Sequence, residues 1–192
     1  MTRPQPPSRG LLARLSRFAR DEGGSATVEF ALIAPAFLFL FLASFESGML
    51  LVRQVMLDRA LDVTVRQVRL GHFDTSADPD GQYEGLHRAL KTTMCQAAAN
   101  PASCMADLRL EMRRVDPRAW SMMGSEAQCE DRRDDTQPML KFTPGVRNEL
   151  MVLRACEVFD PFFPTWGLGK RLAGARGYYA LVSSTAYVIE PS

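Results

Sequence analysis

A single carboxylate stands at the start of the longest apolar run of the chain, and its chemistry needs an explanation. Glu29 follows Gly24 by five residues and is followed at once by Phe30. A charged group in a helix that crosses hydrocarbon costs about 2.5–3.5 kcal/mol on insertion scales, so we expect it to have a function there. Two buried charges that are each costly alone are tolerated as a pair, so a carboxylate in this setting can neutralise a cation.

The order of Gly24, four residues and then Glu29-Phe30 resembles a class III prepilin cleavage site. In prepilins a membrane aspartyl peptidase cuts after the glycine, which implies that Ser25 becomes the mature N-terminus. An α-amino group has a pKa of about 7.7–8.0 and is mostly cationic at neutral pH. The resemblance therefore assigns Glu29, with Phe30 beside it, to pairing with the α-amine of a neighbouring subunit. The alternative is an ordinary signal-anchor helix that starts with a glutamate.

Four cysteines are the second group capable of chemistry, and all of them follow the apolar run. An even number on a side of the membrane that should be oxidising favours two disulfides, for which three connectivities are possible. We prefer a Cys95–Cys104 bridge, which closes a short loop, together with a Cys129–Cys156 bridge. A zinc site is not indicated, because no C-x-x-C pair occurs and the two histidines lack ligand-like spacing to the cysteines.

Other motifs of catalysis and binding are missing from the sequence. Residues 167–171 lack the spacing of a phosphate-binding loop, and no G-x-S-x-G or H-E-x-x-H motif occurs. The acids near residue 80 do not begin a calcium loop, which would need a glutamate where His87 stands. We therefore expect no catalytic residue, cofactor or metal. The aromatic segment 159–166 is the best candidate for an exposed patch, either as a partner-binding surface or as a loop that caps the core.

The charge of the chain is unevenly distributed. Residues 1–24 contain five arginines and two acids and carry +3, whereas the remainder of the 192 residues carries −2. A basic segment before an apolar helix stays in the cytoplasm by the positive-inside rule, so the chain after the helix is expected across the membrane. No convincing secretory cleavage site follows the run, so we expect the helix to be retained. The net charge of +1 does not indicate a nucleic-acid binder.

The apolar run covers about residues 30–52, which is enough to cross a bilayer at about 1.5 Å per residue. Pro35 is expected to bend or locally unwind it, either as a tolerated proline or as a functional hinge. Glu46, near its far end, either reaches the outer interface or pairs with another group. Helical spacing continues beyond the run and predicts one helix over residues 26–70, about 65 Å long, with Gly71 as its stop residue.

The remaining sequence predicts a mixed head. Residues 83–100 keep helical spacing, and alternation of apolar and polar residues indicates a strand near 108–113. Two more strands are expected near 150–159 and 178–189, after a polar loop over 116–145. Helices followed by strands of antiparallel type predict an α+β head.

The segment from Gly24 to about Gly71 resembles the TadE-like family of pilin-like proteins, which accompany Flp-type (Tad, tight adherence) pili in bacteria. The matching residues are Gly24, Val28-Glu29-Phe30, Ala31, Pro35, Glu46, Arg66 and Gly71, with Glu190-Pro191 at the close of the last strand. The resemblance covers about a quarter of the chain well. It implies processing by a prepilin peptidase, a minor-pilin or pseudopilin role in pilus assembly, and no enzymatic activity.

We therefore expect an α+β protein in which a long N-terminal transmembrane α-helix is followed by a small extracytoplasmic head with a helix and an antiparallel sheet. Its parts are a cytoplasmic basic leader (1–24), a transmembrane and extended helix (25–70) and the head (71–192). Such a pseudopilin would sit in the bacterial inner membrane with a periplasmic or extracellular head. Its partners would be the prepilin peptidase, other pilin-like subunits and the pilus assembly machinery. The alternative is a signal-anchored periplasmic protein or enzyme unrelated to pili.

Overall fold

A computed structural model describes residues 25–73, 83–98, 101–118, 127–134 and 141–190. The chain divides into two compact units, residues 1–42 and residues 43–192. It contains a long N-terminal apolar helix and a small domain in which helices accompany a three-stranded antiparallel sheet, so the expected α+β fold is confirmed.

The long helix, α2, runs from Ser25 to Arg69 and continues without interruption through Pro35. Within the first unit its large apolar side chains are exposed; Phe30 and Leu32, for example, are 72% and 74% accessible. Backbone groups of a helix are satisfied within the helix itself, so this stretch needs no other segment of the chain to complete its hydrogen bonds. An exposed apolar surface of this extent is typical of a segment that contacts a membrane or a partner.

α2 ends where the sequence predicted a stop. Gly71 adopts a left-handed φ of +70°, which a residue with a side chain rarely takes. The Gly71 amide donates to the carbonyl of Val68, and the His72 amide donates to that of Gln67. These two bonds form the Schellman arrangement, which satisfies carbonyls left over at the end of the helix.

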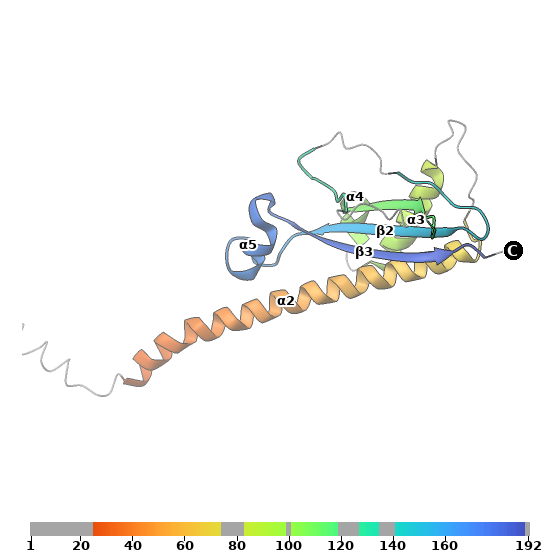
Figure 1. Cartoon of the computed structure of the whole chain (residues 1–192). Helices are drawn as coiled ribbons and strands as arrows, with labels where there is room; N and C mark the ends of the chain where they lie inside the picture. Colours follow the sequence, from red (N-terminus) through yellow and green to blue (C-terminus); the bar gives the residue numbers. More distant parts are fainter. Residues whose placement is uncertain (1–24, 74–82, 99–100, 119–126, 135–140, 191–192) are drawn as a thin grey trace, which may run out of the picture. The chain divides into compact units, whose positions relative to one another are not determined.

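The second unit is built on a sheet in the order β1–β2–β3, in which both neighbouring pairs are antiparallel (Figure 1). β1 covers Leu108–Arg114, β2 covers Leu150–Phe159 and β3 covers Tyr179–Val188. All three strands lie where the alternation of apolar and polar residues predicted them. Side chains alternate between the two faces along each strand, so the sheet offers one face for a core.

Besides α2, the described part of the chain has three shorter helices. α3 (Glu84–Ala97) and α4 (Pro101–Asp107) precede β1, and α5 (Gly167–Ala173) with a short 3₁₀ turn lies between β2 and β3. The single helix expected over 83–100 is therefore correct as far as α3 and is followed by a separate helix. α5 was not expected.

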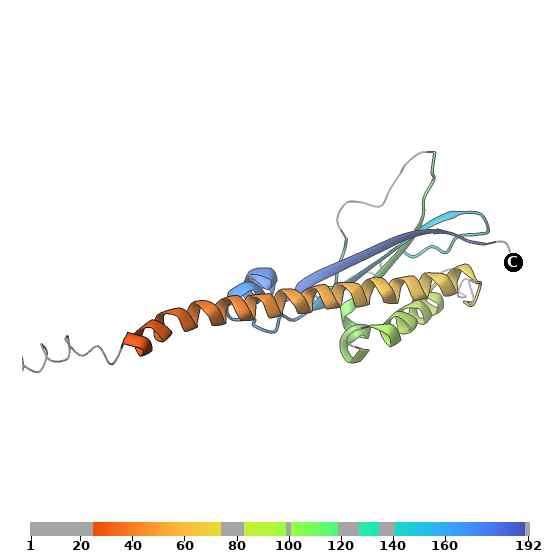
Figure 2. The same ribbon diagram turned by 90° about the horizontal axis from the view of Figure 1, so that it is seen from below.

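The core lies between one face of the sheet and two helices, the second half of α2 and α3 (Figure 2). The α2 residues repeat every three or four positions, which gives the helix one buried stripe. Each large aliphatic side chain buried in this way contributes about 1.5–3 kcal/mol. The chief members of the core are Leu57, Leu61, Val65, Leu90, Met94, Leu110, Met112, Met151 and Leu153.

Both preferred disulfides are present in the structure. Cys95–Cys104 joins α3 to α4, with Cα atoms 5.5 Å apart, and both cysteines are buried within the core. Cys129–Cys156 joins the loop at 127–134 to β2, with Cα atoms 5.2 Å apart. Cys156 alternates with the core residue Ala155, so the second bridge lies on the sheet face opposite the helices.

Candidate functional site

The residues expected to take part in processing and pairing lie at the beginning of α2. Gly24 is outside the described residues, and Ser25 is the first residue of the helix. Glu29 and Phe30 are both exposed on α2. Another molecule can therefore reach the Glu29 carboxylate without displacing any described part of this chain.

Among the residues that the structure describes, α2 is the one helix long and apolar enough to cross a membrane. Its most apolar stretch has no buried residue. One N-terminal helix of this kind is consistent with a single-pass membrane anchor.

Glu46 lies in the second unit and is buried, with 1% of its surface accessible. One carboxylate oxygen accepts the backbone N–H of Phe162 and the other accepts that of Phe163, each at 3.1 Å. Phe45 beside it meets the edges of the same two rings, at centroid distances of 5.5 and 6.4 Å. The carboxylate therefore fixes the turn after β2 to α2, because hydrogen bonds to a charged acceptor are stronger than neutral ones.

Arg53, two turns further along α2, makes a second connection to the same end of the sheet. Its guanidinium donates to the carbonyl of Asp160 at 2.8 Å and to the hydroxyl of Tyr179. It also lies over the rings of Phe159 and Phe162, 5.1 and 4.9 Å from their centroids, which adds cation–π attraction. Burial raises the pKa of Tyr179, although the hydrogen bond from Arg53 opposes that shift.

A second buried carboxylate, Glu157 on β2, has a different environment. It is 1% exposed, and its Oε1 atom has no hydrogen-bond partner within the described part of the chain. Burial first, and then the nearby charge of Asp107, raise its pKa to about 7, while Arg53 opposes the shift. Asp107 in turn is paired with Arg132 at 2.8 Å. A raised pKa often marks an active site, but this group is enclosed, so a substrate has no access to it.

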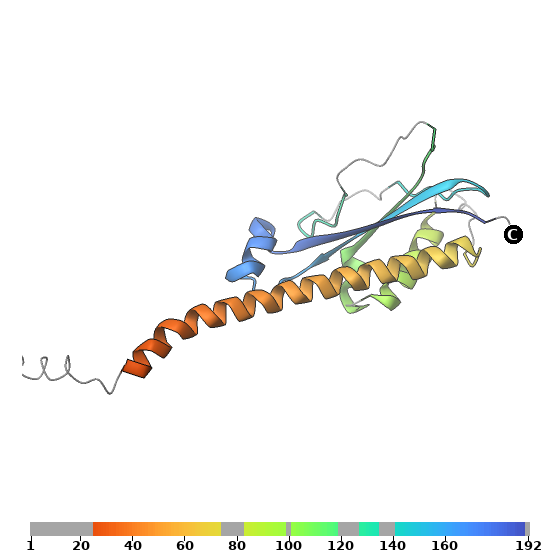
Figure 3. The same cartoon turned by 60° about the horizontal axis from the view of Figure 1, so that its bottom comes forward.

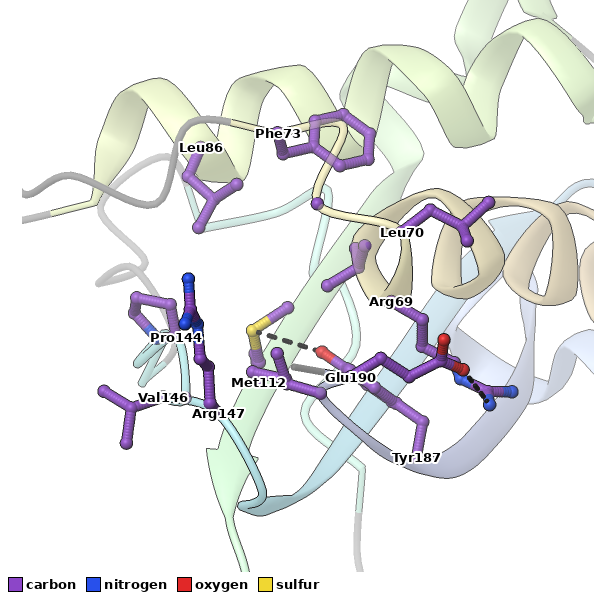
Figure 4. A pocket seen from close by; sticks show the side chains of 14 residues that line it. Arg69, Leu70, Phe73, Leu86, Met112, Pro144, Val146, Arg147, Tyr187 and Glu190 are labelled. Atoms are coloured by element: carbon purple, nitrogen blue, oxygen red, sulfur yellow. Dashed lines mark hydrogen bonds and ion pairs between the residues drawn. The ribbon is translucent and has the colours of Figure 1, made fainter. Parts of the chain in front are cut away.

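A groove of about 690 Å³ opens at the other end of the head, between the end of α2 and the loop before β2 (Figure 4). The Tyr187 hydroxyl donates to the Met112 sulfur at 3.7 Å, and Arg69 pairs with Glu190 at 2.7 Å. The described lining includes no histidine, cysteine or serine that could act as a nucleophile or base. Its lining residues are Val68, Arg69, Leu70, Gly71, Phe73, Leu86, Met112, Pro144, Gly145, Val146, Arg147, Tyr187, Ile189 and Glu190.

Within the described ranges, no group of three or more histidine, cysteine, aspartate or glutamate side chains could hold a metal ion.

These features define a class: a chain with one long apolar helix, consistent with a single-pass membrane anchor, and a disulfide-bonded α+β head. Residues 24–66, less than a quarter of the chain, match the family model described as TadE-like protein. The recognition of this segment as TadE-like, from the pilin-like family of Tad pili, is confirmed. Comparison with curated proteins and with solved structures gave no significant match.

The TadE-like match supports a role related to Tad (Flp) pili and points to other pilus components as partners. Proteins of this pilus family are structural and not enzymes. The matched residues include Glu29, Pro35, Glu46 and Arg53. Sequence reasoning had singled out the first three but missed Arg53 and the contact that Glu46 makes. The sequence pointed to this contact only through an acid in an apolar helix, Glu46, and an aromatic segment after a strand. No spacing rule connects Glu46 with Phe162, because the two are 116 residues apart.

Proposed function

We propose that the protein is a pilin-like (pseudopilin) membrane subunit that acts in Flp/Tad pilus biogenesis and is cut between Gly24 and Ser25 by a prepilin peptidase. The match of residues 24–66 to the TadE-like family carries this proposal. The position of Gly24 five residues before Glu29 supports the finer step, because the match begins at that glycine.

In this mechanism cleavage creates a cationic α-amine at Ser25. The Glu29 carboxylate of one subunit pairs with the amine of its neighbour, which makes two costly charges tolerable in an apolar setting and sets the register between subunits. The exposure of Glu29 and Phe30 on α2 supports this role, since both can be reached by a second helix. Pro35 lies in the same stretch, either as a tolerated proline of a membrane helix or as a hinge.

The proposed topology follows from charge and redox chemistry. The basic leader (1–24) stays in the cytoplasm, the helix (25–70) crosses the inner membrane, and the head (71–192) lies on the periplasmic or extracellular side. Two disulfides and no free cysteine support this side, because disulfides persist in oxidising compartments.

Cleavage is tested by N-terminal sequencing of protein extracted from membranes that contain an active prepilin peptidase. We expect chains that begin at Ser25, and we expect Gly24→Leu to yield intact chains because a side chain at that position blocks the cut. Recovery of only intact Met1 chains from the unaltered protein would refute the processing step.

The pairing role is tested with Glu29→Ala and Glu29→Gln, each of which removes the charge. We expect normal protein level, membrane location and head disulfides, together with a loss of surface pili. Asp62→Asn is the matched control, because Asp62 is an exposed acid on the part of α2 that belongs to the head. Surface pili are counted beside an immunoblot of the membrane fraction. Wild-type pili at wild-type level in Glu29→Ala would contradict the pairing role and favour a simple signal anchor.

A further inference from the structure

Four aromatic side chains gather where β2 ends and α5 begins: Phe45, Phe162, Phe163 and Trp166, which we call the aromatic foot. The rings form a connected set, with centroid distances of 5.5 Å for Phe45–Phe162 and 5.5 Å for Phe163–Trp166. Phe45, Phe162 and Trp166 are nevertheless 41–45% exposed. Single exposed apolar residues are ordinary, whereas a contiguous exposed aromatic cluster marks a binding surface.

The chain around the foot is basic. Residues 161–178 contain Lys170, Arg171 and Arg176 and no acidic residue. All three basic residues are exposed. Lys170 and Arg171 belong to α5 and Arg176 to the 3₁₀ turn that follows it; Figure 3 draws this helical segment in blue. Exposed Leu172 adds an apolar side chain to the same short helix. Aromatic rings next to the exposed cations Lys170 and Arg171 fit a surface that is apolar beneath and anionic at its boundary, which describes a lipid headgroup layer.

The position of Phe45 along α2 gives the depth at which this surface would act. Phe45, beside Glu46, lies near the far end of the apolar run at residues 30–52, and α2 is helical throughout. A hydrocarbon core roughly 30 Å thick takes about 20 residues of helix at about 1.5 Å per residue, so its outer boundary falls in the last part of this run. Tryptophan and other aromatic residues are enriched at this boundary.

Glu46 explains why the foot stays at that level. Its buried carboxylate holds the amides of Phe162 and Phe163 one residue beyond Phe45 on the helix. The aromatic segment of the head is thereby fixed to α2 next to Phe45, near the far end of the apolar run.

We propose that the aromatic foot binds the lipid surface on the head's side of the membrane, with its rings at headgroup level and Lys170 and Arg171 against anionic headgroups. The foot joins Phe45 of α2 to the segment after β2, and this peripheral membrane contact fixes how the head is held against the bilayer. This inference goes beyond the pseudopilin proposal and does not depend on it, because it requires neither cleavage nor a pilus.

The test uses the full chain, one molecule per lipid nanodisc, with Trp120→Phe so that Trp166 is the one remaining tryptophan. The lipids are either unlabelled or brominated near the glycerol end of the acyl chains. We expect bromine to reduce Trp166 emission at least about twofold, and the lipid to shield it from aqueous acrylamide. The control is Val188→Trp with both native tryptophans changed to phenylalanine. Val188 is 45% exposed at the opposite end of β3, about 30 Å away along a ten-residue strand, so its emission should be insensitive to bromine.

The charge contribution is tested with Lys170→Glu/Arg171→Glu in discs with and without anionic lipid. We expect the double variant to lose most of the bromine quenching that anionic discs give, while intact disulfides on a non-reducing gel verify the fold. Absence of quenching in both lipid mixtures would overturn the proposal. Shielding of Trp166 that appears only when several chains share a disc would also overturn it, since the foot would then be a contact between copies.

Discussion

Replacement of Glu46 by alanine should destabilise the head. The substitution removes both acceptors of the Phe162 and Phe163 amides, which lie in a part-buried turn held against α2. The aromatic contacts between Phe45 and the two rings would remain but would lose their polar anchor.

The size of the effect follows from two opposing contributions. Hydrogen bonds to a charged group contribute about 1.5–3 kcal/mol each, so two of them contribute about 3–6 kcal/mol. Removal of a buried carboxylate also removes its desolvation cost, which reduces the net loss to about 3 kcal/mol. In a unit of the size of residues 43–192, a loss of 1 kcal/mol lowers Tm by about 2–4 °C, so we expect a fall of about 6–12 °C.

The measurement is thermal unfolding of the full chain in detergent micelles, followed by near-ultraviolet circular dichroism, which reports the packing of aromatic side chains. Hydrogen exchange at the amides of Phe162 and Phe163 gives a local readout, and both should lose protection. Glu46→Gln keeps one acceptor oxygen and should lose about half as much. Asp62→Ala is the control, because loss of an exposed carboxylate should change stability by less than about 0.5 kcal/mol. If Glu46→Ala melts within about 1 °C of the unaltered protein, the two amide bonds do not stabilise the head as argued.

Three further predictions concern the head. The two disulfides should stabilise the head unequally, because their sequence separations are 27 and 9. By loop-closure entropy, replacement of Cys129 and Cys156 by serine should cost about 3.6 kcal/mol, and replacement of Cys95 and Cys104 about 2.6 kcal/mol. Denaturant midpoints of the two double variants show which one is less stable. Because the pKa of Glu157 is raised to about 7, the stability that its protonated form gives the fold is fully present below about pH 4.5 and is lost as pH rises to about 7. Glu157→Gln should therefore be about 2 kcal/mol more stable than the unaltered protein at pH 8 and equally stable near pH 4. Burial, with the charges of Lys91 and Arg109, lowers the pKa of His87 to about 4. The stability that neutral His87 gives the fold is therefore present above pH 6.5 and is lost as pH falls to 4. In His87→Gln, the free energy of unfolding measured with urea should fall less between pH 6.5 and pH 4 than in the unaltered protein.

The elements of the head were predictable where local pattern decides them. Alternation along Leu108, Leu110 and Met112 marked β1, and the spacing of Leu86, Leu90 and Met94 marked α3. The disulfide pairing followed from compartment and loop length, since both features are visible along the chain.

α5 could not be predicted because its glycines conceal it. Gly169 has low helix propensity, yet a Cβ at this position would lie 2.6 Å from the carbonyl oxygen of Phe163 and 2.9 Å from the side chain of Pro161. The glycine is required by close packing of the helix on the turn before it, and close packing is a tertiary property. The partners of Glu46 and Arg53 were hidden for the same reason, since both contacts join α2 to residues more than a hundred positions away.

The role of α2 in the core has a mechanical consequence. The helix that contains the candidate membrane span also supplies Leu57, Leu61 and Val65 to the core of the head. A force pulling along the axis of this helix therefore acts on the core directly, without a linker that could stretch first. It loads the packed α2 side chains in shear, all at once, whereas a force across the axis would peel them apart one after another.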